Sequence, residues 1–260
     1  MQQRLYSDNF KEIIKFSKDN GFYVGTGNHA AKMLIIGKEA SIDIEKNPIQ
    51  HDIEFTNNAI DWENNITNNV QITDIRFQNE QAYNPIYPYR GQKNKIEHKA
   101  TGHNGGTSRT YFFYQNLIDQ VFNNGKKSET INFHEQCFIT ELNQITSPYS
   151  HRIPKKVRAE SIAKRHPFFR QTFFQKFPIV VVATGHYVRD FNIDLEALFN
   201  VKFISPTIDL GGGNWINIHH GIVNGEPKLL IHTNQLSMIK SILIDEIAKI
   251  CKKWIGENEK

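Results

Sequence analysis

The chain has few cysteines and no long apolar segment. Two cysteines among 260 residues, Cys137 and Cys251, are too few for a disulfide scaffold, an all-cysteine zinc site or a four-cysteine iron–sulfur cluster. No stretch approaches the roughly 18 apolar residues of a membrane span. The first twelve residues, MQQRLYSDNFKE, lack the apolar segment of a secretion signal. We therefore expect a cytoplasmic protein that uses no cofactor and does not enter a membrane.

The net charge of +4 is small, but it is unevenly distributed. From Arg152 to Arg170, seven basic residues and a single acid, Glu160, give a local charge of +6. The remainder of the chain therefore carries −2. The basic residues of this segment are Arg152, Lys155, Lys156, Arg158, Lys164, Arg165 and Arg170. Such a stripe suits a nucleic-acid backbone, because each neutralised phosphate releases counterions. An ordinary solvated helix face would give the same pattern.

Four short apolar runs predict the strands of one sheet. They cover residues 33–36, 137–140, 179–183 and 229–231. Helical patterns separate these runs, at residues 8–20, 107–122, 156–176 and 238–254. The third is expected to be helical despite Pro167, in two pieces. The alternation predicts an α/β fold, a three-layer α/β/α sandwich with a central, mainly parallel four-stranded sheet. We expect a single domain over residues 1–260, with a polar, irregular insertion at about 47–104.

Polar side chains follow each predicted strand, where ligands of a parallel sheet usually bind. An acid, Glu39, follows the first strand, and a histidine, His232, ends the last. The other candidate ligand-binding residues at these ends are Gly37, Ser41, Glu141, Asn143, His186 and Asn234. The pair His219-His220 has no supporting carboxylate or cysteine spacing, so we expect no metal site.

In order and content, these segments resemble the uracil-DNA glycosylase superfamily from about residue 32 to residue 250. The first motif of that superfamily, Gly-Gln-Asp-Pro-Tyr-His, is matched by Gly37-Lys38-Glu39, with Glu in place of Asp. The last motif, His-Pro-Ser-Pro-Leu-Ser, is matched at the same spacing by His232, Leu236 and Ser237. The segment FITELNQITSP lies where the family has a base-reading Asn, and residues 183–186 resemble the glycine-containing turn between these motifs.

The resemblance implies a monofunctional DNA glycosylase, a monomer that flips a modified pyrimidine out of DNA and hydrolyses its bond to the sugar. Glu39 would orient water and stabilise the oxocarbenium-like sugar, and His232 would stabilise the departing base. Leu236 would wedge into the duplex beside Ser237. The DNA backbone would be bound by Lys155, Lys156, Arg158, Lys164 and Arg165. The alternative interpretations are a helix-starting acid for Glu39, a buried structural histidine for His232 and a core contact for Leu236.

Departures from the family pattern concern the substrate. Ala40-Ser41 replaces the Pro-Tyr that excludes 5-substituted pyrimidines, and either Glu141 or Asn143 stands where the base is read. A carboxylate there would accept from the N4 amino group of cytosine and repel O4 of uracil. The favoured substrate is a hypermodified cytosine of phage DNA, such as glucosylated 5-hydroxymethylcytosine. The favoured role is antiviral defence. Uracil excision in base-excision repair, a non-catalytic DNA-binding module and a hydrolase of free nucleosides are the alternatives.

Two further features of the sequence suit a large flipped base and its DNA. Tyr83, Tyr87, Tyr89 and Arg90 in the insertion would stack on a base or sugar. Backbone amides of the glycine-rich segments 102–106 and 211–214 would approach phosphates. An ordinary loop is the alternative for both segments.

Overall fold

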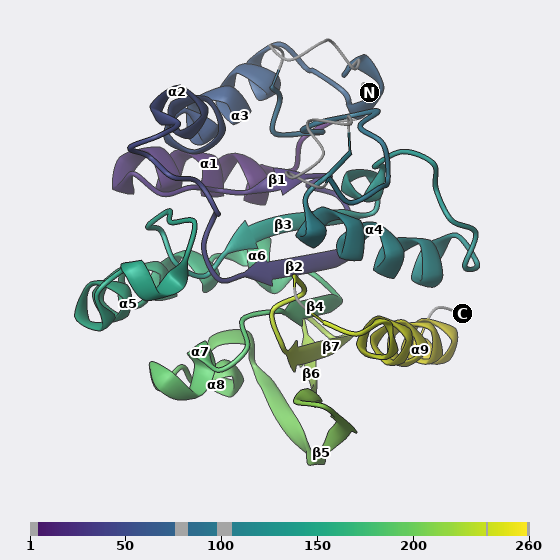
Figure 1. Ribbon diagram of the computed structural model, residues 1–260. Helices are drawn as coiled ribbons and strands as arrows, with labels where there is room; N and C mark the ends of the chain where they lie inside the picture. The colour runs from purple at the N-terminus through teal and green to yellow at the C-terminus, as the bar shows by residue number, and fades with distance from the viewer. Residues whose placement is uncertain (1–4, 76–82, 98–105, 238, 259–260) are drawn as a thin grey trace.

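A mixed seven-stranded sheet forms the centre of the computed structural model, which describes residues 5–75, 83–97, 106–237 and 239–258 (Figure 1). Its strands are β1 (Thr26–Gly27), β2 (Met33–Gly37), β3 (Cys137–Glu141), β4 (Ile179–Val182), β5 (Val201–Gly211), β6 (Asn214–Val223) and β7 (Glu226–Thr233). The order across the sheet is β1-β3-β2-β4-β7-β6-β5. The predicted α/β class is confirmed, but the prediction of a four-stranded sheet was wrong.

The four predicted strands form the parallel block β3-β2-β4-β7 in the middle of this sheet. Their register sets the geometry of the site. Gly37 pairs with Glu141, and Val182 pairs with both Ile36 and His232. The carboxyl ends of all four strands therefore lie level at one edge of the sheet.

The antiparallel hairpin of β5 and β6 was missed by the sequence analysis, which interpreted the glycine run before Asn214 as part of a loop. Gly211, Gly212 and Gly213 all have positive φ, a conformation that favours glycine, and they make the turn between the two strands. Alternating side chains along Asn214–Val223 fit a strand with one buried face. Pro206 and the polar face of β5 conceal the partner strand from a search for apolar runs.

Helices cover both faces of the sheet (Figure 1). One face carries α1 (Asp8–Asn20), α3 (Asn58–Thr67), α5 (Lys155–Phe169), α6 (Thr172–Gln175), α7 (Tyr187–Asp190) and α8 (Leu195–Phe199). The other carries α4 (Arg109–Phe122) and α9 (Ser241–Asn258). No helix in the described ranges is long and apolar enough to cross a membrane.

Local signals place several helix ends where the sequence predicts them. Ser7 caps α1 by accepting from the amide of Phe10, and Gly21 ends it at a φ of 66°. Ser108, not Thr107, caps α4. The expected two helical pieces are present as α5 and α6, but the division lies after Phe169, because α5 runs through Pro167. Proline removes one bond, to the carbonyl of exposed Ala163, which water can satisfy.

The segment predicted as an irregular insertion is largely helical where it is described. It contains α2 (Pro48–His51), the π-helix η1 (Asp52–Thr56), α3 and the 3-10 helix η2 (Ile72–Asp74). Trp62 on α3 is fully buried in the core, and its indole donates to the Gly25 carbonyl at 2.8 Å. The first part of this segment is therefore integrated into the core rather than added outside it. Residues 102–105 of the glycine-rich segment lie outside the described residues.

Candidate functional site

Glu39 lies just beyond β2, with a half-buried carboxylate held by three side chains. Its Oε2 accepts from the Tyr187 hydroxyl at 2.7 Å, and Asn143 Nδ2 lies 3.5 Å from the same oxygen. Its Oε1 accepts from the Ser150 hydroxyl. No helix begins here, since α2 starts only at Pro48, so the interpretation of Glu39 as a helix-starting acid was wrong. The contacts fix the position of this carboxylate at the strand edge.

Tyr187 connects Glu39 to two cations. Its hydroxyl accepts from Arg158 Nη1 at 3.2 Å while donating to Glu39. Lys38 Nζ lies 4.9 Å from the centroid of its ring. Burial lowers the pKa of Lys38, and Glu39 opposes that shift. Burial also raises the pKa of Tyr187 to about 12, so its hydroxyl remains a donor at physiological pH.

His232 is buried at the end of β7, 6% exposed, and its ring meets that of Trp215 edge-on with centroids 4.8 Å apart. Its Nε2 lies 2.9 Å from the Gly185 carbonyl oxygen, which can only accept, so Nε2 carries the hydrogen. Burial lowers the pKa of His232 to about 4, so the ring is neutral near pH 7. Any ligand that accepts a hydrogen bond from Nε2 of His232 must compete with the Gly185 carbonyl.

The turn after β4 joins the two predicted catalytic residues. Gly185 contacts His232, and Tyr187, two residues later, contacts Glu39. A methyl group placed on Gly185 would lie 3.8 Å from Lys38 Nζ, so the lysine flanks the same turn. Glu39, Lys38 and His232 therefore surround one short segment at the carboxyl ends of β2, β4 and β7.

Glu141 ends β3 directly beside Gly37. A Cβ atom on Gly37 would lie 2.2 Å from Glu141 Oε2, so this position needs glycine to admit the carboxyl group. Burial, with a contribution from the charge of Glu39, raises the pKa of Glu141 to about 8, and Arg165 opposes the shift. Its Oε2 is buried and has no hydrogen-bond partner. Asn143, by contrast, contacts Glu39 and accepts from the amide of Ile145.

The remaining predicted ligand-binding residues are distributed differently. Ser41 and His186 are exposed near the strand edge, and the His186 ring stacks on Trp215. Asn234 is occupied by the backbone of the β5–β6 hairpin. It accepts from the amide of Trp215 and donates to the Gly213 carbonyl. Its contacts are those of a tether for the hairpin, and the prediction that it binds substrate has no support in this arrangement.

Two predicted DNA contacts are contradicted by burial. Leu236 is 1% exposed in the core under α9, so it presents no wedge at the surface and the core-contact alternative holds. Arg165 is fully buried and donates to the Tyr23 carbonyl at 2.9 Å, to Gln144 Oε1 at 2.6 Å and to Thr140 Oγ1 at 3.1 Å. Ser237 is half-buried next to Leu236, and Met238 lies outside the described residues.

The other basic residues of α5 remain accessible. Lys155, Lys156 and Lys164 are exposed, whereas Arg158 is half-buried against Tyr187. The amino end of α5 lies beside the Glu39 site, because Arg158 donates to the Tyr187 hydroxyl, which donates to Glu39. The exposed Lys155 and Lys156 belong to the same first turn of α5.

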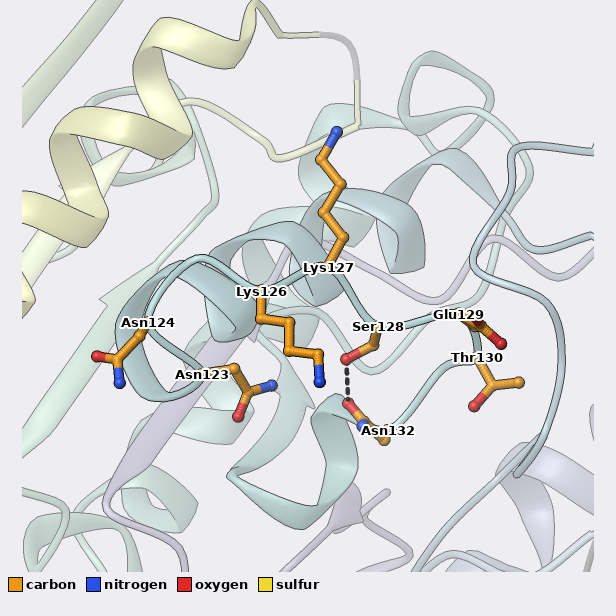
Figure 2. A pocket seen from close by; sticks show the side chains of 8 residues that line it. All are labelled: Asn123, Asn124, Lys126, Lys127, Ser128, Glu129, Thr130 and Asn132. Atoms are coloured by element: carbon orange, nitrogen blue, oxygen red, sulfur yellow. Dashed lines mark hydrogen bonds between the residues drawn. The ribbon is translucent and has the colours of Figure 1, made fainter.

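A separate pocket of about 560 Å³ lies in the segment between α4 and β3 (Figure 2). It is lined by Asn123, Asn124, Lys126, Lys127, Ser128, Glu129, Thr130 and Asn132. Buried Asp119 shapes it by accepting from Asn123 and from the hydroxyl and amide of Ser128. Because this segment precedes β3, the pocket lies at the amino end of that strand, away from Glu39 and His232.

Tyr187 and Ser150 are the members of the site that the sequence analysis missed. Tyr187 directly follows the predicted turn 183–186, which was the available signal. Ser150 has no comparable signal. Comparisons with protein families, with curated proteins and with solved structures found no match.

Replacing Tyr187 with Phe is expected to lower the rate of any reaction that uses Glu39 by about 10- to 100-fold, the value of a hydrogen bond to a charged group. The Tyr187 hydroxyl positions the Glu39 carboxylate, so kcat should fall more than KM changes. Tyr149→Phe, at a ring 55% exposed, is the control. A native kcat in Tyr187→Phe would show that Tyr187 only packs against its neighbours.

Proposed function

We propose that this chain is a monofunctional DNA glycosylase that extrudes a modified pyrimidine, preferably a cytosine derivative, and hydrolyses its N-glycosidic bond. The observation that carries the proposal is the placement of Glu39, Lys38 and His232 around the single turn 185–187. An acid that faces a developing cation and donors that face a departing anion are what this bond cleavage requires. The resemblance of the strand-end motifs supports the same activity.

In the proposed reaction, the N1–C1′ bond breaks and its electron pair leaves with the base. Glu39 stabilises the positive charge on the sugar and accepts a proton from the water that adds to C1′. Tyr187 and Ser150 hold the carboxylate in place. The products are the free base, once it is protonated, and an abasic site, and no cofactor takes part in these steps.

The departing base carries the negative charge, and two donors are available for it. His232 would donate through Nε2 after the base displaces the Gly185 carbonyl. The Lys38 ammonium also flanks Gly185. A neutral histidine and a nearby ammonium together stabilise an anionic leaving group without full protonation.

Glu141 is the better candidate for reading the base, because its buried oxygen has no partner whereas Asn143 is committed to its neighbours. With a pKa of about 8, Glu141 is protonated at neutral pH. A carboxylic acid then offers one donor and one acceptor, which matches N3 and N4 of cytosine. The reverse pairing also matches uracil, so uracil is the second candidate base.

Selectivity for cytosine derivatives over uracil is expected to rise with pH. Below about pH 8 the Glu141 carboxyl group pairs with either base, and above it the carboxylate repels O4 of uracil. The measurement is the ratio of kcat/KM for the two bases, in matched DNAs, between pH 6.5 and pH 9. Glu141→Gln should give a ratio that is independent of pH. A falling ratio in the native protein would contradict the assignment.

The first turn of α5 is expected to bind the DNA backbone next to the site. Replacing Lys155 and Lys156 together with Gln should reduce the slope of log affinity against log salt concentration by about 2, at about 0.9 for each phosphate contact. Lys252→Gln with Lys253→Gln removes the same charge from α9 and serves as the control. Equal losses in both double variants would indicate only a general effect of net charge.

The proposed activity is tested with a panel of DNAs that contain uracil, 5-hydroxymethylcytosine or its glucosylated form. Mass spectrometry of the released bases should detect one of them together with alkali-labile sites in the DNA. DNA binding without release of any base would favour the non-catalytic alternative. A role in defence against phages is supported if the released base is a hypermodified cytosine of phage DNA.

A further inference from the structure

Five tyrosines gather with two carboxyl groups, those of Glu54 and Glu141. This tyrosine cluster consists of Tyr23, Glu54, Tyr83, Tyr89, Tyr111, Tyr114 and Glu141. Ring centroids are 6.3 Å apart for Tyr83 and Tyr89, 6.2 Å for Tyr89 and Tyr111, and 6.4 Å for Tyr111 and Tyr114. Burial is the main cause that raises the pKa of Tyr23, Tyr111 and Tyr114, and the charge of Glu141 adds to it in all three.

Most side chains of the tyrosine cluster lie between the core and the surface. Tyr83, Tyr89, Tyr111, Glu54 and Glu141 all retain intermediate exposure. Burial is nevertheless the main cause that raises the pKa of each of these groups. Side chains that are surrounded by protein and still reach solvent are typical of the walls of a binding site.

Three irregular features of the structure meet in this cluster. Glu54 lies on a π-helix, a form that is common at functional sites. Tyr89, whose hydroxyl donates to Glu54, has a φ of 58°, which is unfavourable for a bulky residue. Glu141 keeps a buried oxygen without a partner. Packing alone requires none of the three, whereas a ligand that bonds to these groups would account for them together.

The cluster adjoins the Glu39 site. Glu141 lies against Gly37, two residues before Glu39, and Ala40 packs against the stacked pair of Tyr23 and Phe55. A base read by Glu141 would therefore have the tyrosines next to it. A group attached to that base would also lie beside the tyrosines.

The chemistry of the cluster favours a neutral group rich in hydroxyls. Aromatic faces accept the C–H surface of a sugar ring, and tyrosine hydroxyls and a protonated carboxyl group both donate and accept hydrogen bonds. Among the residues that the structure describes, those of the cluster include no lysine or arginine to pair with an anion, and the guanidinium of nearby Arg165 is engaged. We infer that the tyrosine cluster binds a neutral, hydroxyl-rich substituent, such as a sugar, on the pyrimidine that the Glu39 site excises. This inference rests on the proposed function.

The test measures DNA affinity in a Glu39→Gln background, where the base stays attached. Duplexes carry one 5-hydroxymethylcytosine or one glucosylated 5-hydroxymethylcytosine. We expect the glucosylated duplex to bind at least about tenfold more tightly. Tyr89→Phe and Tyr111→Phe should each reduce this preference by about two- to tenfold, the range for one hydrogen bond, with the affinity for the other duplex unchanged. Tyr6→Phe is the control, because that tyrosine is not part of the cluster and its hydroxyl donates to the Val70 carbonyl.

Equal affinity for the two duplexes, or equal losses for both in the tyrosine variants, would overturn the inference. Tighter binding of a duplex with 5-carboxylcytosine or 5-aminomethylcytosine than of the glucosylated one would overturn the neutral class. Base release by the native protein is measured separately. A preference for the glucosylated duplex without any base release would contradict the proposed function and leave the tyrosine cluster as a recognition site.

Discussion

Replacing Glu39 with Gln is expected to reduce base release by roughly a hundred- to thousand-fold, the usual effect of removing one group that stabilises a transition state. The amide keeps the shape of the side chain and one oxygen that can accept from Tyr187 or Ser150, but it has no charge to oppose the cationic sugar. DNA affinity should change little, since the basic groups of α5 are untouched. The measurements are single-turnover base release and equilibrium DNA binding.

The matched control is Glu45→Gln, which alters an exposed carboxylate six residues away on the same connection. It should leave both measurements unchanged. If Glu39→Gln retained the native rate, the assignment of Glu39 would be wrong. A parallel loss of DNA binding would instead show that the carboxylate organises the surface rather than the reaction.

Replacing Arg165 with Met is expected to lower the free energy of unfolding by about 3–5 kcal/mol, the cost of removing one partner from a buried charged network. The Tyr23 carbonyl, Gln144 and Thr140 would lose their donor inside the core. The guanidinium also packs on the Phe168 ring, 4.1 Å from its centroid. At about 2–4 °C per kcal/mol, the thermal midpoint should fall by about 10 °C.

Lys164→Met is the matched control, because the neighbouring side chain on α5 is exposed. It should leave the thermal midpoint within about 2 °C of the native value, as surface substitutions usually do. The prediction would be contradicted if both variants had native stability. The two variants also separate stability from DNA binding within the basic segment. Arg165 is buried in the core, and only Lys164 of the two is available to DNA.

The error on Arg165 shows where a count of charges fails. The buried positions of α5 are Ser161, Ile162, Arg165, Phe168 and Phe169, which recur with the helical period. The spacing therefore placed Arg165 on the apolar side of the helix, although its type suggested the surface. Leu236 failed for a related reason, because a motif match does not show whether a side chain points outward.

The parallel core and the edge that carries Glu39 and His232 were predictable, because continuous apolar runs identify buried parallel strands. The β5–β6 hairpin was not, since its outer strand is almost entirely exposed and contains no apolar run. The hydrogen bonds around Glu39 depend on how the segments at Ser150 and Tyr187 fold back. Such contacts between residues more than a hundred positions apart leave no local pattern.

The most direct test of the proposed activity is the fate of water oxygen during reaction in H₂¹⁸O. Native protein is incubated with DNA that contains the base released most rapidly from the panel, and both products are analysed by mass spectrometry. Hydrolysis at the glycosidic bond should give an unlabelled free base and one ¹⁸O atom in the abasic sugar. A label in the released base, or DNA that keeps its base while the backbone is cut, would contradict a hydrolytic glycosylase.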